Sequence, residues 1–291
     1  MQKIMIERAA ELLSTGKVNR VLGWRAGLFD HDNTPSVFTD AADLQANFVY
    51  NEFCGANLSK YLVKESDKEG TVAVFLKPCD TYSFNQLIAE HKIKRDNVYA
   101  IGVRCDGMKD VNDREKLEER CASCKSRKHV AYDELIGESG EILDSNRFDM
   151  VEKLENMTSE ERFEFWRGEL SRCVRCNACR NVCPACTCEK CIFDNPDSGS
   201  ANKAPADPFE ENLFHIIRAF HVAGRCTDCG ECSRVCPENI PLHLLNRKFI
   251  KDINELYGEY QAGETVNERG PLVNYTQGDA EPSVVYERGN S

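Results

Sequence analysis

Apolar and polar positions follow different periods in the two halves of the chain. Before residue 150, short runs rich in β-branched residues are bounded by turn residues, at 18–25 (VNRVLGWR), 71–79 (TVAVFLKPC) and 97–105 (NVYAIGVRC). Residues 80–93, between the last two runs, place apolar side chains at helical spacing. Strand, helix and strand in this order predict a βαβ unit and hence a parallel sheet. A helix over residues 3–15 is expected to precede it.

After residue 150 the apolar spacing is helical. Residues 156–173 contain Thr158 and Glu161 at the spacing of a capping box, and residues 207–226 are amphipathic. Residues 241–258 begin with proline, which suits the first turn of a helix. We therefore predict an α/β domain over 1–150 with a parallel βαβ sheet and an all-α domain over 151–260. A polar loop at 192–207 and an extended or disordered tail over 261–291 complete the prediction.

Cysteine content changes the picture most. The chain has 291 residues, of which 16 are cysteine, and a formal net charge of -11. Its N-terminus is charged and lacks the pattern of a signal peptide, and no apolar run is long enough to span a membrane. We therefore expect a cytoplasmic protein whose reduced cysteines bind metal. The acidic charge argues against a nucleic-acid partner.

Two copies of the pattern C-x2-C-x2-C-x3-C-P dominate the second half. The first copy is Cys173, Cys176, Cys179 and Cys183, and the second is Cys226, Cys229, Cys232 and Cys236. In two-cluster ferredoxins the fourth cysteine of each motif ligates the other 4Fe-4S cluster. The expected ligand sets are therefore Cys173, Cys176, Cys179 and Cys236 for one cluster, and Cys226, Cys229, Cys232 and Cys183 for the second. The alternative is a pair of structural zinc sites, which normally use two C-x2-C pairs.

The helices around these motifs make residues 165–250 resemble a known group of domains. These are the α-helical dicluster ferredoxin domains of the electron-transfer subunits of heterodisulfide reductase and succinate dehydrogenase. The resemblance implies a ferredoxin domain with two 4Fe-4S clusters.

Four further cysteines are expected to meet in the first half. Cys79 and Cys105 each end a predicted strand, and parallel strands place their carboxyl ends at one edge of a sheet. Cys121 and Cys124 follow as a C-x2-C pair. These four thiols would suffice for a third 4Fe-4S cluster. The alternative is that Cys79 and Cys105 are small buried hydrophobic residues.

Three segments of this half resemble the β-subunit family of deazaflavin-reducing hydrogenases and formate dehydrogenases. They are KPCD (77–80), IGVRC (101–105) and the C-x2-C pair followed by AYDELIGE (131–138). The resemblance implies an iron–sulfur cluster in this region, beside an FAD that reduces the deazaflavin. A counterpart of the portion that completes the flavin site is not evident in this sequence, and no G-x-G-x-x-G loop is present. We therefore expect the cluster but not FAD.

Four cysteines remain, namely Cys54, Cys186, Cys188 and Cys191. They could hold a fourth cluster that bridges the two halves. Alternatively, the last three could hold zinc with another ligand, or all could be free thiols. His215 and His221, on the helix before Cys226, are expected to have packing or surface roles.

These features predict an electron-transfer subunit of an anaerobic oxidoreductase complex. Its clusters would relay single electrons, and its partners would resemble a hydrogenase, a formate dehydrogenase or a flavin-containing heterodisulfide-reductase-like subunit. No acid–base carboxylate pair or nucleophile triad stands out in the sequence. The alternative function is that of an enzyme subunit that oxidises or reduces a flavin or deazaflavin in the crevice of the α/β domain.

Overall fold

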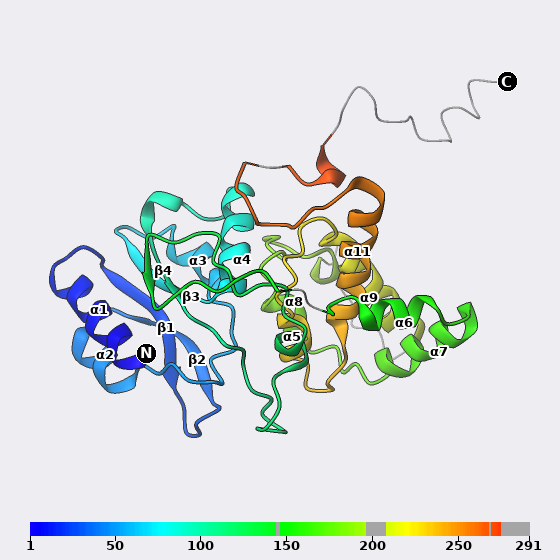
Figure 1. Cartoon of the computed structure of the whole chain (residues 1–291), viewed down its shortest axis with the longest axis horizontal. Coiled ribbons are helices and arrows are strands. Elements are labelled where there is room, and N and C mark those ends of the chain that lie inside the picture. The colour runs from blue at the N-terminus through cyan, green and yellow to red at the C-terminus, as the bar shows by residue number, and fades with distance from the viewer. Residues whose placement is uncertain (144–145, 196–207, 268, 275–291) are drawn as a thin grey trace.

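The two halves of the chain lie side by side, with the α/β half at one end of the molecule and a group of helices at the other (Figure 1). A computed structural model of the chain describes residues 1–143, 146–195, 208–267 and 269–274. The elements of the first half are α1 (Gln2–Ser14), β1 (Arg20–Ala26), β2 (Asn33–Phe38), α2 (Ala41–Asn47), α3 (Ser59–Glu65), β3 (Val72–Leu76), α4 (Pro78–Ala89), the 3-10 turn η1 (Arg95–Asn97), β4 (Val98–Val103), α5 (Glu119–Ala122) and β5 (Glu134–Ile136).

One five-stranded sheet, in the order β2-β1-β3-β4-β5, forms the centre of this half. Strands β1, β3, β4 and β5 are parallel, as the βαβ pattern predicts. The edge strand β2 is antiparallel to β1, with Pro35 opposite Trp24. The sheet is therefore mixed rather than purely parallel. Proline is tolerated here because β2 has a neighbour on one side only and can leave a hydrogen-bonding position unused.

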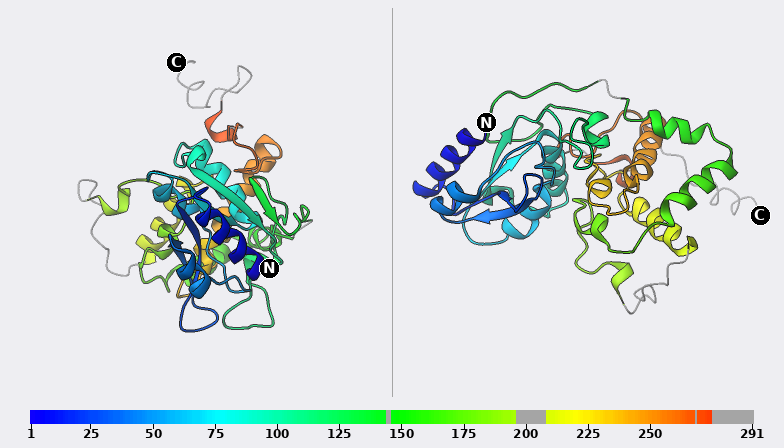
Figure 2. Two further views of the ribbon diagram at one scale, coloured as in Figure 1. Left: turned by 90° about the vertical axis from the view of Figure 1, so that its left-hand side faces the viewer. Right: turned by 90° about the horizontal axis from the view of Figure 1, so that it is seen from below.

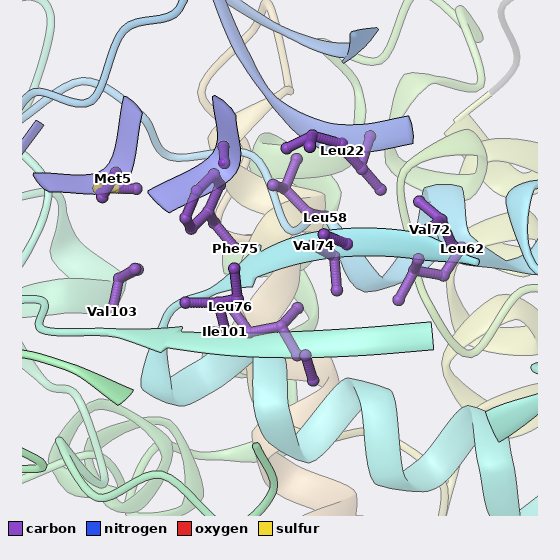
Figure 3. Packing of buried hydrophobic residues seen from close by; sticks show 14 of the residues in the cluster. Met5, Leu22, Leu58, Leu62, Val72, Val74, Phe75, Leu76, Ile101 and Val103 are labelled. Carbon is purple, nitrogen blue, oxygen red and sulfur yellow. The ribbon is translucent and has the colours of Figure 1, made fainter. Parts of the chain in front are cut away.

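The core of the α/β half is built on the continuous apolar run of β3. All five residues of that strand are buried, as expected for a parallel strand covered on both faces. Figure 3 shows Phe75 and Leu76 of β3 beside Ile101 of β4, with Leu22 and Leu58 among the neighbouring buried side chains. This packing fixes the ends of β3 and β4, and the cysteines that follow these strands are Cys79 and Cys105.

The second half carries helices α6 (Asp149–Glu155), α7 (Ser159–Leu170), α8 (Ala178–Asn181), α9 (Pro208–His221), α10 (Glu231–Arg234) and α11 (Leu242–Tyr257), and the 3-10 turns η2 (Ile192–Asp194) and η4 (Pro271–Val273). The capping box at the start of α7 is present, with Thr158 and Glu161 each bonding the other's backbone amide. Helix α9 packs against α7 and α11, and Figure 2 shows these helices gathered beyond the sheet.

The expected loop and tail are only partly described. Residues 196–207 of the loop and 275–291 of the tail lie outside the described residues. The described start of the tail runs back over the chain itself, where Asn85 of α4 donates to the carbonyl of Glu264 over 3.3 Å. Among the described helices, none combines the length and apolarity needed to cross a bilayer.

Candidate metal centres

The two ferredoxin motifs fold in the same way. In each, a four-residue helix (α8 or α10) follows the second cysteine and carries the third one. Arg175 and Asn177 of the first motif have positive φ angles of 53° and 61°, and Asp228 and Gly230 occupy the corresponding positions of the second with 56° and 67°. Left-handed backbone is costly for residues other than glycine. Its recurrence at matching positions shows that the two motifs share one backbone turn around their cysteines.

The first set of thiols lines a single small cavity. Cys173, Cys176, Cys179 and Cys236 border it, so the structure brings the fourth cysteine of the second motif to the first three of the first motif. His215 of α9 lies in the wall of the same cavity, with Nε2 3.2 Å from Sγ of Cys173. Burial, followed by the charges of Arg218 and Arg175, lowers the pKa of His215 to about 3. The ring is therefore neutral near pH 7, and its Nε2–H can donate to the sulfur.

The second set is gathered around Cys183. Burial first, and then the neighbouring Cys229 and Cys183, raise the pKa of the Cys226 thiol. Cys183 and Cys232 likewise act on Cys229 after burial and Glu231, and the net effect raises its pKa. The four thiols of this crossed set therefore lie within electrostatic reach of one another.

The cysteines of the third set lie within electrostatic reach of one another. Burial and then Asp80 raise the pKa of the Cys79 thiol, with further contributions from Cys105 and Cys124. Burial raises the pKa of the Cys105 thiol to about 11, and the nearby Cys121 also acts to raise it. Cys79 differs from its expected place, because it lies in the first turn of α4 rather than at the end of β3. The helix starts early because Pro78 occupies its first turn, a position that proline favours.

A buried ion pair stands beside this third set. Nζ of Lys77 lies 3.0 Å from Oδ2 of Asp80, with both side chains at most 1% exposed, and donates to the carbonyl of Ala56 over 2.8 Å. The ammonium also sits 4.5 Å from the ring centroid of Trp24. Such a pair costs desolvation energy that only good geometry and further hydrogen bonds offset. Sequence patterns gave no sign of this pair, because a Lys-x-x-Asp spacing is common on exposed helices.

The remaining cysteines do not gather into one set. Cys54 is fully buried in the α/β core, where its sulfur accepts from the Asn51 amide over 3.3 Å. Burial raises the pKa of its thiol to about 11, and the charges that act on it come from Lys77 and Cys105. Cys186, Cys188 and Cys191 instead border a separate cavity with Lys60 and Arg225. The structure thus places Cys54 beside the third set and brings it to none of these three.

The chemistry of the donor sets, each of four thiols, fits 4Fe-4S clusters. All 16 cysteines fall within the described residues and are free of disulfides. In that described part of the chain, no group of three or more His, Cys, Asp or Glu side chains is arranged to hold one metal ion. Thiolates around zinc converge to about 2.3 Å from the metal. Around a cube they stand farther apart, because four irons and four sulfides lie between them.

A cluster of charges joins the two halves next to these sets. Glu231 of α10 is 2% exposed and accepts from Arg120 over 2.7 Å and from Arg234 over 2.7 and 2.9 Å. Burial opposes its charge, but Arg234 and Arg120 outweigh burial and lower the pKa of Glu231 to about 2. A cavity of about 360 Å³ opens beside this cluster, lined by residues of both halves such as His31 and His243.

Comparison with known proteins agrees with the arrangement of the second half. Residues 169–240 match the family described as the 4Fe-4S dicluster domain. A putative ferredoxin-3 of Sinorhizobium fredii is 35% identical over 81 residues, which cover 27% of this chain and 75% of that protein. The chain therefore belongs to the 4Fe-4S dicluster ferredoxins in this region.

Two longer relatives extend over most of the chain. The F420-dependent formate dehydrogenase subunit beta of Methanocaldococcus jannaschii is 23% identical over 338 residues, covering 85% of this chain and 88% of the relative. The F420-dependent formate dehydrogenase 1 subunit beta of Methanococcus maripaludis is 25% identical over 308 residues, covering 73% and 78%. The chain resembles these β-subunits well beyond residues 77–138, where the quoted segments lie.

Proposed function

We propose that this protein is the iron–sulfur subunit of a multisubunit oxidoreductase complex of the formate dehydrogenase, hydrogenase or heterodisulfide reductase type. It passes single electrons between a partner subunit and its own clusters. The observation that carries the proposal is the 4Fe-4S dicluster domain at 169–240 within a chain that resembles formate dehydrogenase β-subunits over most of its length.

The proposed relay has three 4Fe-4S clusters. Two are held by the crossed sets of the dicluster domain, and the third by Cys79, Cys105, Cys121 and Cys124 of the α/β half. When bound, each cluster supplies reversible one-electron chemistry at a potential set by charge, hydrogen bonds to sulfur and solvent exposure. The chain's residues hold the thiols in place, bury them and supply the neighbouring charges. A fourth cluster is not part of the proposal, since Cys54 lies with Lys77 and Cys105.

Reductive titration of the anaerobically purified full-length chain tests this function. We expect stepwise reduction by dithionite with electron paramagnetic resonance signals of reduced 4Fe-4S clusters, and reoxidation without loss of iron. A colourless protein that binds zinc and takes up no electrons would contradict the proposal.

A second function is favoured by the names of the two longer relatives, which are described as F420-dependent. In that case the chain would itself exchange electrons with a flavin or deazaflavin, and the cavity beside Glu231, with a volume of about 360 Å³, would be a place to bind it. Stoichiometric flavin retained by the isolated chain, or quenching of deazaflavin fluorescence on binding, would support this function. If neither retained flavin nor fluorescence quenching is observed, this second function is rejected and electron relay remains the proposed function.

A further inference from the structure

Arg218 of α9 is buried, and its guanidinium has no hydrogen-bond partner within the described part of the chain. Its side chain is 2% exposed, and Nε, Nη1 and Nη2 all lack a hydrogen-bond partner among the residues that the structure describes. Guanidinium is always charged in proteins and presents five N–H donors. A buried charge that is neither paired nor hydrogen-bonded costs several kcal/mol, so arginine is almost never left in this state. The unbonded donors therefore indicate that a negatively charged hydrogen-bond acceptor is held next to this guanidinium.

The surroundings of Arg218 are cysteines of both ferredoxin sets. Burial lowers the pKa of this guanidinium, but neighbouring thiols raise it by more, so the net pKa lies above its ordinary value. These thiols belong to Cys232, Cys179, Cys183 and Cys186. Cys179 belongs to the first crossed set, whereas Cys183 and Cys232 belong to the second. The guanidinium thus lies within electrostatic reach of cysteines of both sets, and it borders a cavity together with Cys186.

We propose that Arg218 donates hydrogen bonds to sulfur atoms of both ferredoxin clusters and holds the reduction potentials of both at higher values. This inference rests on the proposed function, because it needs clusters in the two crossed sets. It makes Arg218 a positioning and tuning residue rather than a ligand.

The physical basis is the charge that a cluster gains on reduction. An added electron increases the negative charge of the cube, and a fixed cation close by stabilises that state more than the oxidised one. Inside the protein, screening by water and salt is weak, so one buried charge acts on both sites. Hydrogen bonds to the sulfurs act in the same direction, since they also withdraw negative charge. Planar guanidinium has enough donors to reach two sides at once.

His215, one turn earlier on α9, gives a useful contrast. Its Nε2 lies 3.2 Å from Sγ of Cys173, and the ring borders the cavity of the first set. A change at His215 is therefore expected to shift one potential, whereas a change at Arg218 shifts two.

The test is a redox titration of the full-length protein, followed by electron paramagnetic resonance, for the wild type and the variants Arg218→Met, Arg218→Lys and Arg172→Met. Arg172→Met is the matched control, because it removes the same charge next to Cys173 in the sequence. Unlike Arg218, the Arg172 side chain is 43% exposed and paired with Glu169. We expect both ferredoxin potentials to fall in Arg218→Met, to fall less in Arg218→Lys, and to stay unchanged in Arg172→Met. Unchanged potentials in both Arg218 variants would overturn the inference.

Arg218→Lys decides the matter if the methionine variant fails to assemble, since lysine keeps the charge but loses the planar fork. A second readout uses protein labelled with ¹⁵N in the arginine guanidinium. Pulsed resonance of the reduced clusters should show ¹⁵N coupling in the wild type that disappears in Arg218→Lys; no coupling in the wild type would overturn the inference. Lack of any cluster signal in the wild type would instead refute the proposed function itself, so the two failures are distinguishable.

Discussion

Arg120 donates a hydrogen bond from Nη1 to the carbonyl oxygen of Cys229 over 2.9 Å, although the two residues lie 109 positions apart. Arg120 directly precedes Cys121 of the third set. At the other end of the same short segment, Lys125 follows Cys124 and donates to the carbonyl of Thr227, the neighbour of Cys226. The loop with the C-x2-C pair of the α/β half therefore lies against the second ferredoxin motif. In the proposed relay, this contact is where electrons would pass between the two halves.

Removing one ligand of the third set should remove one cluster and spare the other two. For Cys124→Ala we expect a loss of about four irons per chain, because each 4Fe-4S cluster holds four. The ferredoxin pair should keep its resonance signals. Iron and sulfide analysis measures the loss, and Cys229→Ala, which should cost an equal amount from the second crossed set, is the comparison. Loss of all iron in Cys124→Ala, with the protein still folded, would show that the sets are not independent.

Cys54 and Cys188 should be dispensable for clusters. The sulfur of Cys54 accepts from the Asn51 amide within the α/β core, and Cys188 borders the cavity near Lys60. We expect Cys54→Ala and Cys188→Ala to keep the iron content of the wild type. A loss of about four irons in both variants would instead establish a fourth cluster.

The buried pair of Lys77 and Asp80 should be costly to break from one side. Lys77→Met leaves Asp80 buried without its cation, and we expect the free energy of unfolding to fall by about 3–5 kcal/mol. Denaturant unfolding under anaerobic conditions measures it. Lys77→Met combined with Asp80→Asn removes both charges and should recover part of the loss. The exposed Lys64→Met is the control and should change little. Equal stability of Lys77→Met and the wild type would refute the role assigned to the pair.

The ion pair between Arg8 and Glu134 should make stability depend on pH. It ties α1 to β5 over 2.8 Å, with side chains 26% and 27% exposed. Burial raises the pKa of Glu134, but hydrogen bonds from Arg8 and Tyr99 outweigh it, so the net pKa lies below its ordinary value of 4.5. A carboxylate with a lowered pKa stabilises the folded state above its unfolded pKa, and this stability is lost as the pH falls below 4.5.

Glu134→Gln should therefore cost about 1 kcal/mol near pH 7, the range expected of a partly exposed pair. The difference from the wild type should shrink as the pH is lowered below 4.5. Unfolding curves at a series of pH values measure it, with the exposed Glu138→Gln as control. A difference that stays constant down to acidic pH would contradict this account.

Sequence pattern predicted much of the fold because its signals are local. The β-branched runs and the helical spacing between them predicted β3, α4 and β4, and the parallel register of these strands is confirmed. Strand β2 was not predicted, since it is short and polar and contains Pro35, which argues against a strand unless it lies at an edge. The antiparallel edge therefore depends on the tertiary contact with β1.

The site, too, could be predicted from the sequence only where its signals are local. Cysteine spacing is local, so the ferredoxin motifs could be recognised from the sequence alone. The partners of the thiols could not, because they depend on which face of α9 turns inwards. His215, for which a packing or surface role is expected, contacts Cys173, and Arg218 lies within electrostatic reach of both sets. Only three-dimensional packing reveals such contacts between residues far apart in the chain.

The iron and acid-labile sulfide content of the anaerobically purified full-length chain measures how many clusters the relay contains. We expect about twelve irons per chain with matching sulfide, since each of three 4Fe-4S clusters holds four. About eight irons would contradict it, because the cysteines of the α/β half would then hold no cluster.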